Sequence, residues 1–247
     1  MDRLVHTSLS ALRGAMARQA ATANNLANAN TTGFRAEIAS VRPLWIQGGT
    51  FAARAQASEE VLAADMKAGE IKETGRDLDV AMLGDALLAV QGPEGDEAYT
   101  RRGDLQRTDS GLLTTGDGYP VIGDQGPITL PPADSLRIDQ NGAIWIVPPG
   151  GDPNQPQQID RLKLASPTGS RIVKALDGLF RVEGGGALPG DPTAKIASGS
   201  LEGSNVDATK ALVDMIEASR AWDTQLKLIS TARELDGSAA DLMRLPD

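Results

Sequence analysis

Apolar side chains recur at alternating spacings of three and four along the first thirty residues. In an α-helix this spacing lines one face, as in the seam of a coiled coil. The positions are Val5, Leu9, Leu12, Met16, Ala20 or Gln19, Ala23 and Leu26. Gly33 then fits the left-handed backbone position that ends a helix, with Phe34 available for the accompanying apolar contact. The pattern predicts an N-terminal helical region over residues 1–35.

A second seam with the same spacing lies near the C-terminus. It consists of Leu212, Met215, Ser219, Trp222, Leu226 and Ile229. Asn205 or Asp207 is a suitable N-cap, and Gly237 is a possible stop signal. These features predict a C-terminal helical region over residues 201–247.

Between the seams, over residues 71–200, short apolar runs alternate with Asp-Gly and Asn-Gly turns. Such closely spaced runs are typical of an antiparallel β domain. The expected strands are Leu78–Met82, Ala86–Val90, Tyr99–Arg102, Gly111–Thr115, Pro120–Ile122, Leu136–Ile138, Ala143–Val147, Ile172–Leu176 and Leu179–Val182. Residues 36–70 show no sustained period, so they are expected to form an extended connector that orders against a partner.

The expected fold class is therefore mainly β with α termini, in which a central antiparallel β domain is flanked by helices that pair into a coiled-coil-like bundle. A helix of about 22–26 residues measures about 33–39 Å, which is long for a small β domain to cover. Packing of both helices on their own β domain remains the alternative.

Four amides interrupt the end of the first seam, at Asn24, Asn25, Asn28 and Asn30. Asparagine is a poor helix former and is costly to bury. A polar side chain at a seam trades stability for register and choice of partner. We interpret these amides as devices that set the register of an assembly.

Composition offers little support for an enzyme. The formal net charge of -9 disfavours non-specific binding of nucleic acid. The chain has no cysteine and one histidine, His6, which argues against thiolate chemistry and multi-histidine metal sites. Acidic pairs such as Asp77/Asp79 match ordinary strand alternation, and no nucleophile-elbow motif is present. We expect no catalytic residue, cofactor or metal.

No apolar run is long enough to insert into a membrane. The Arg- and Ser-containing N-terminus has the composition of a mitochondrial presequence. A presequence that is cleaved off would not need a matching helix at the other end of the chain, so we disfavour this alternative.

Three stretches resemble one family of proteins. "ANNLANANTTGFR", from Ala23 to Arg35, is similar to the N-terminal signature of the axial proteins of the bacterial flagellum, which form its rod and hook. The segment from Ala68 to Asp124 resembles the start of their shared β domain, and "LEGSNVDATKALVDMIEASRAWDTQLKLI" resembles their C-terminal helix signature. The opening "MDRLVHTSLSAL" and the short length favour a proximal-rod type. The distal-rod protein FlgG or another hook or rod axial protein is the alternative within the family.

The resemblance implies a structural subunit of the basal-body rod in the periplasmic space, exported by the flagellar type III apparatus. Its partners would be proximal-rod subunits, distal-rod FlgG and copies of itself. The expected assembly residues are Leu9, Leu12, Met16, Asn24, Asn25, Leu26, Asn28, Asn30, Gly33, Phe34, Leu212, Met215, Trp222, Leu226 and Ile229. A monomeric β-domain module that binds a ligand such as a carbohydrate or peptide is the alternative from another class.

Overall fold

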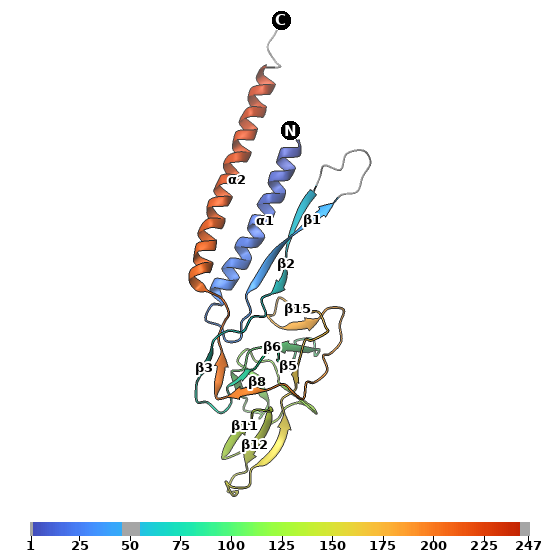
Figure 1. The fold of residues 1–247 in the computed structure, drawn as a ribbon, viewed down its shortest axis with the longest axis vertical. Helices are drawn as coiled ribbons and strands as arrows, with labels where there is room; N and C mark the ends of the chain where they lie inside the picture. The colour runs from blue at the N-terminus through green and yellow to red at the C-terminus, as the bar shows by residue number, and fades with distance from the viewer. Residues whose placement is uncertain (1, 46–54, 243–247) are drawn as a thin grey trace. The chain divides into compact units, whose positions relative to one another are not determined.

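A computed structural model describes residues 2–45 and 55–242 (Figure 1). The chain divides into two compact units. The helical unit comprises residues 1–27, 37–63 and 207–247, and the β unit comprises residues 28–36 and 64–206. This division differs from the four ranges expected from sequence, because residues 28–36 group with the β strands and most of the expected connector groups with the helices.

The helical unit contains two helices, α1 (Asp2–Ala27) and α2 (Ala208–Leu242), which lie side by side (Figure 1). Asp207 caps α2, since its Oδ1 accepts a hydrogen bond from the backbone N–H of Lys210 at 3.0 Å. The expected stop at Gly237 is wrong, because α2 continues through it to Leu242. One glycine costs a helix only about 1 kcal/mol, which its neighbours can offset.

Two strands occupy the segment for which the sequence indicated only an extended connector. They are β1 (Glu37–Trp45) and β2 (Ala55–Ala64), and they form a two-stranded sheet. Strand β1 contains Pro43, which lacks a backbone donor and is tolerated mainly in edge strands. In a sheet of two strands both are edges, so the proline is compatible with the pairing.

The β unit is built from short antiparallel strands. A five-stranded sheet has the order β14-β5-β6-β16-β15, a three-stranded sheet has the order β11-β12-β13, and the remaining strands pair as β10-β9, β17-β4, β18-β3 and β7-β8. The strands are β3 (Ile71–Glu73), β4 (Val80–Met82), β5 (Leu87–Gln91), β6 (Glu97–Thr100), β7 (Leu105–Arg107), β8 (Leu113–Thr115), β9 (Ile122–Gly123), β10 (Gly126–Pro127), β11 (Ser135–Ile138), β12 (Ala143–Val147), β13 (Gln157–Arg161), β14 (Leu164–Ala165), β15 (Ile172–Lys174), β16 (Phe180–Val182), β17 (Ile196–Ser198) and β18 (Ser200–Glu202).

Strand β5 supplies side chains to both apolar cores of this unit. Leu88 and Val90 belong to the larger core, whereas Leu87 and Ala89 belong to a smaller one that also contains Tyr99. Successive side chains of a strand point to opposite faces, so a strand covered on both faces reads as a continuous apolar run. This explains why "ALLAV" was recognisable from sequence.

The fold is mainly β with a helix near each end of the chain, as expected. The finer expectation, a coiled-coil-like bundle, remains a prediction. Neither helix in the described part of the chain is long and apolar enough to cross a bilayer.

Candidate functional site: assembly faces and a buried arginine pair

One face of helix α2 is less exposed than the rest of the helix. Several apolar side chains of α2 lie outside this face. The less exposed positions are Ala211, Met215, Ala218, Trp222, Gln225 and Ile229, which again alternate by four and three. Of the five assembly residues expected on α2, three lie on this face. Leu212 and Leu226 are 49% and 45% exposed, and Ile216, Leu228 and Leu235 are also exposed. The less exposed face therefore agrees with the expected seam at three positions, and it is shifted by one residue at Leu212 and Leu226.

Helix α1 buries small residues rather than the largest ones. Gly14, Ala15 and Ala21 are buried, whereas Met16 is 54% exposed. Leu12 and Leu26 are half-buried. The side chain of Leu9 lies outside the residues whose burial the structure describes. Exposure of Met16 leaves it available to a neighbouring molecule, so its assembly role remains a prediction.

Asn24 and Asn25 bind the start of β1. The Asn25 side chain donates to the carbonyl of Glu37 at 2.9 Å and accepts from the N–H of Glu37 at 2.7 Å. Asn24 donates to the Glu37 carboxylate at 2.7 Å. The side-chain amide of Asn25 therefore bonds both backbone groups of Glu37, as a neighbouring strand would. Asn28 accepts from the Thr31 hydroxyl at 3.1 Å, and Asn30 is exposed. A register role between subunits remains a prediction for all four amides.

Replacing Asn25 with alanine should free the start of β1 from α1. The substitution removes two hydrogen bonds, each of which contributes about 0.5–1.5 kcal/mol. We therefore expect the backbone amide of Glu37 to exchange with solvent deuterium about 10-fold faster or more. Asn30→Ala is the matched control and should leave this amide unchanged. Equal exchange of the Glu37 amide in both variants would show that the Asn25 side chain does not hold the start of β1.

Gly33 has the predicted left-handed backbone, with φ of +67°. The expectation that it ends the helix is wrong, because α1 ends at Ala27. Its N–H donates to the carbonyl of Glu202 at 2.7 Å, and a Cβ at this position would overlap the backbone of Arg101. Gly33 is thus required both by its backbone angle and by close packing against another part of the β unit.

Arg101 and Glu202 form a buried ion pair in the β unit. The Glu202 carboxylate accepts from Nε and Nη2 of Arg101 at 2.8 and 2.6 Å. The remaining donors of Arg101 reach the carbonyls of Met82, Gly84 and Ala86. All five N–H groups of this guanidinium are therefore used. The side chains are 2% and 0% exposed, so water contributes little to their solvation.

A second arginine, Arg35, binds the same carboxylate from the strap, the name used here for residues 28–36. Its Nη2 lies 2.7 Å from Oε1 of Glu202, and its Nη1 donates to the carbonyl of Lys67. The Nε is buried without a hydrogen-bond partner. Burial lowers the pKa of Arg35, Glu202 opposes this, and the charge of Arg101 lowers the pKa further.

Further hydrogen bonds hold the end of the strap. The N–H of Ala36 donates to the Asn205 side chain at 2.7 Å, and that amide donates in turn to the carbonyls of Asp65 and Lys67. Lys174 donates to the carbonyl of Arg35 at 3.1 Å, and its ammonium lies 3.8 Å from the centroid of the Phe34 ring. Phe34 thus contacts the β unit here rather than closing a helix.

Sequence reasoning assigned no site role to Arg35, Arg101 or Glu202, and it considered Asn205 only as an N-cap, whereas its side chain binds Ala36, Asp65 and Lys67. Their partners are distant in the chain, as Arg101 is from Glu202 and Asn205 is from Ala36, so no local spacing connects them.

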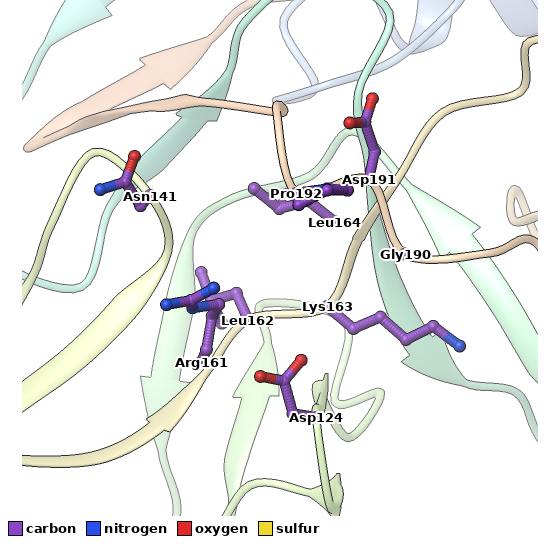
Figure 2. A pocket seen from close by; sticks show the side chains of 9 residues that line it. All are labelled: Asp124, Asn141, Arg161, Leu162, Lys163, Leu164, Gly190, Asp191 and Pro192. Atoms are coloured by element: carbon purple, nitrogen blue, oxygen red, sulfur yellow. The ribbon is translucent and has the colours of Figure 1, made fainter.

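The β unit also contains a pocket of about 310 Å³ that is lined by both polar and apolar residues (Figure 2). The lining residues are Asp124, Asn141, Arg161, Leu162, Lys163, Leu164, Gly190, Asp191 and Pro192. Lys163 pairs with Glu97 at 2.7 Å, outside this lining. Within the described residues no group of three or more His, Cys, Asp or Glu side chains is placed to hold a metal ion. The pocket defines no recognisable catalytic arrangement.

Comparison with known proteins places the chain in a class of structural proteins. Residues 6–35 match the family described as "Flagella basal body rod protein", residues 81–146 match "Flagellar hook protein FlgE/F/G D1 domain", and residues 197–242 match "Flagellar basal body rod FlgEFG protein C-terminal". The three matches follow the order of the N-terminal helix, β unit and C-terminal helix.

Full-length relatives narrow this class. The flagellar basal-body rod protein FlgF of Salmonella typhimurium is 39% identical over 251 residues, covering 99% of this chain and all of the relative. FlgF of Escherichia coli K12 gives the same identity and coverage, and the rod protein FlgG of Bacillus subtilis is 30% identical with 99% and 100% covered. The chain therefore belongs to the flagellar basal-body rod protein family, and within it to the FlgF type.

Proposed function

We propose that this rod subunit polymerises helically through α1 and α2, within the proximal rod, and transmits torque in flagellum-dependent motility. Its role as a structural subunit of the basal-body rod follows from its family, and the absence of any enzymatic activity is part of the proposal. The particular faces, neighbours and position along the rod are the proposed part.

The exposed apolar side chains of α2 carry this proposal. One neighbouring helix covers one face of α2, yet Leu212, Ile216, Leu226 and Leu228 remain about half exposed outside it. A helix that is apolar on several sides is normally covered on several sides. Helices from adjacent subunits would supply that cover, and folding of the helical unit would then be coupled to assembly.

Contacts of this kind repeat from one subunit to the next. Because α1 and α2 present different surfaces, the contacts would be heterologous, and heterologous contacts that do not close a ring build helical filaments. The proposed neighbours are other proximal-rod subunits, copies of this chain and distal-rod FlgG. We also propose export by the flagellar type III apparatus and residence in the periplasmic part of the basal body.

Location can be tested directly in purified hook–basal bodies. We expect an epitope on the exposed loop at residues 150–155 to label the proximal rod. Labelling of the distal rod instead would favour a FlgG-like position, and absence of the chain from the rod would overturn the proposal.

A charge on the exposed apolar face of α2 should block assembly. Leu226→Glu places a carboxylate where an apolar contact is proposed, and burying an unpaired charge costs several kcal/mol. We expect incorporation into the rod to fall at least about 10-fold, as measured by immunoblotting of basal bodies. Thr224→Glu adds the same charge elsewhere on the exposed surface of the helix and should assemble normally. Equal incorporation of both variants would exclude Leu226 from the interface.

A further inference from the structure

We propose that the strap, residues 28–36, is a closing element that docks onto an already folded β unit and can leave without unfolding it. The two arginines that share Glu202 would then have different roles. Arg101 is part of the folded β unit, whereas Arg35 enters with the strap. This inference concerns the β unit itself and is independent of how subunits assemble.

The first argument is the balance of buried charge. Arg35 and Arg101 are 1% and 2% exposed, and the one carboxylate that contacts both is Glu202. The Arg101–Glu202 pair alone is neutral. Docking of Arg35 adds one positive charge to it, and Asp65 offsets this charge in part. Burying a surplus charge is costly, so strap docking is less favourable than its contacts suggest.

The second argument is the use of donors. Arg101 makes hydrogen bonds with all five N–H groups, and three of its acceptors are backbone carbonyls in or next to β4 and β5. Arg35 leaves its buried Nε without a partner. Loss of Arg101 would leave backbone carbonyls without hydrogen-bond donors and Glu202 less well solvated. Loss of Arg35 removes a guanidinium group whose hydrogen-bond donors are only partly paired.

The third argument concerns what an open strap would leave behind. Glu202 would keep Arg101 and the N–H of Gly69, which donates to Oε1 at 2.8 Å. Asn205 would keep its two bonds to the carbonyls of Asp65 and Lys67. The Glu202 carboxylate and the Asn205 side-chain NH2 group thus keep protein partners without the strap, whereas the Glu202 carbonyl and the Asn205 backbone N–H would turn to water. A docked strap is an ordered part of the β unit, whereas an open strap is a flexible tether between the two units.

The test compares Arg35→Met with Arg101→Met in the full chain. Methionine has a similar length and no charge, so each variant removes one guanidinium. Two readouts are needed: hydrogen exchange at the amides of Gly33 and Ala36 for the strap, and the urea midpoint of β-sheet circular dichroism for the β unit.

We expect Arg35→Met to accelerate exchange at Gly33 and Ala36 at least about 10-fold, because the lost bonds to Glu202 and to the carbonyl of Lys67 outweigh the relief of the surplus charge. The urea midpoint should move by less than about 0.3 M. We expect Arg101→Met to lower that midpoint by more than about 1 M. If Arg101→Met yields no soluble protein, Arg101→Lys replaces it and should still have the lower midpoint of the pair.

Two results would overturn the proposal. A fall of the midpoint in Arg35→Met as large as that in the Arg101 variant would make the strap an integral part of the β unit. Unchanged exchange at Gly33 and Ala36 would show that Arg35 does not control docking.

Discussion

Replacing Glu202 with glutamine is expected to destabilise the β unit by about 3–5 kcal/mol, the cost of removing one partner from a buried ion pair. Glutamine keeps the shape and can still accept from Gly69, but it removes the single negative charge that both buried guanidinium groups contact. Arg101 would then be buried beside a neutral amide, and the strap would lose the ion-pair partner of Arg35. The free energy of unfolding, obtained from urea denaturation of the purified chain, measures this effect.

Glu70→Gln is the matched control. Glu70 directly precedes β3. It pairs with Lys72 at 3.6 Å, but both side chains are at least 70% exposed. Exposed pairs contribute about 0–1 kcal/mol, so this variant should be close to wild type. Similar stability of the two variants would mean that the buried cluster is not a major determinant of the fold.

Replacing Gly33 with alanine should prevent the strap from docking. A left-handed backbone costs a residue with a Cβ about 1–2 kcal/mol, and here the added carbon also overlaps the backbone of Arg101. Together these penalties should exceed about 3 kcal/mol, which corresponds to more than about 100-fold in a docking equilibrium. Exchange at the Ala36 amide should rise accordingly, while the urea midpoint of the β unit should change little.

Gly75→Ala separates the two penalties. Gly75 also has a positive φ, +72°, but a Cβ there would meet nothing within 4 Å. This variant should show only the backbone cost and should leave exchange at Ala36 unchanged. If Gly33→Ala also left that amide protected, close packing of the strap against Arg101 would be refuted.

Local sequence patterns were sufficient to predict an element where one residue type and one spacing decide its structure. Strand β12, Ala143–Val147, was expected with its observed bounds because an apolar run follows an Asn-Gly turn. Asp207 was identified as a possible cap on the same kind of local chemistry. Strands with polar or exposed residues were missed. Ile71–Glu73 is exposed along its length and pairs with β18 through backbone hydrogen bonds, which leave no periodic signal.

The role of "ANNLANANTTGFR" could be predicted only in part. Its resemblance to a rod signature identified the family, yet the expected uses of Gly33 and Phe34 at a helix end were wrong. Both residues serve the strap, and the partners that define the strap lie at Arg101, Lys174 and Glu202. No spacing rule connects residues so far apart in the chain. Contacts of that range depend on the completed topology of the sheets.

The strap has a topological consequence as well. Within the β unit, Gly33 and Phe34 exchange backbone hydrogen bonds with Glu202 and Asn205, at the end of β18. Strand β18 also pairs with β3, with Ser200 opposite Glu73, so the segment between these two strands begins and ends at one place. A unit whose entry and exit adjoin behaves as an insertion between two flanking segments, and insertions of this kind are tolerated because their ends need not be moved. The exposed loops between β3 and β18 could therefore be lengthened, shortened or exchanged while the ends of the segment stay in place, provided that Arg101 and Lys174, which contact Glu202 and the strap, are kept.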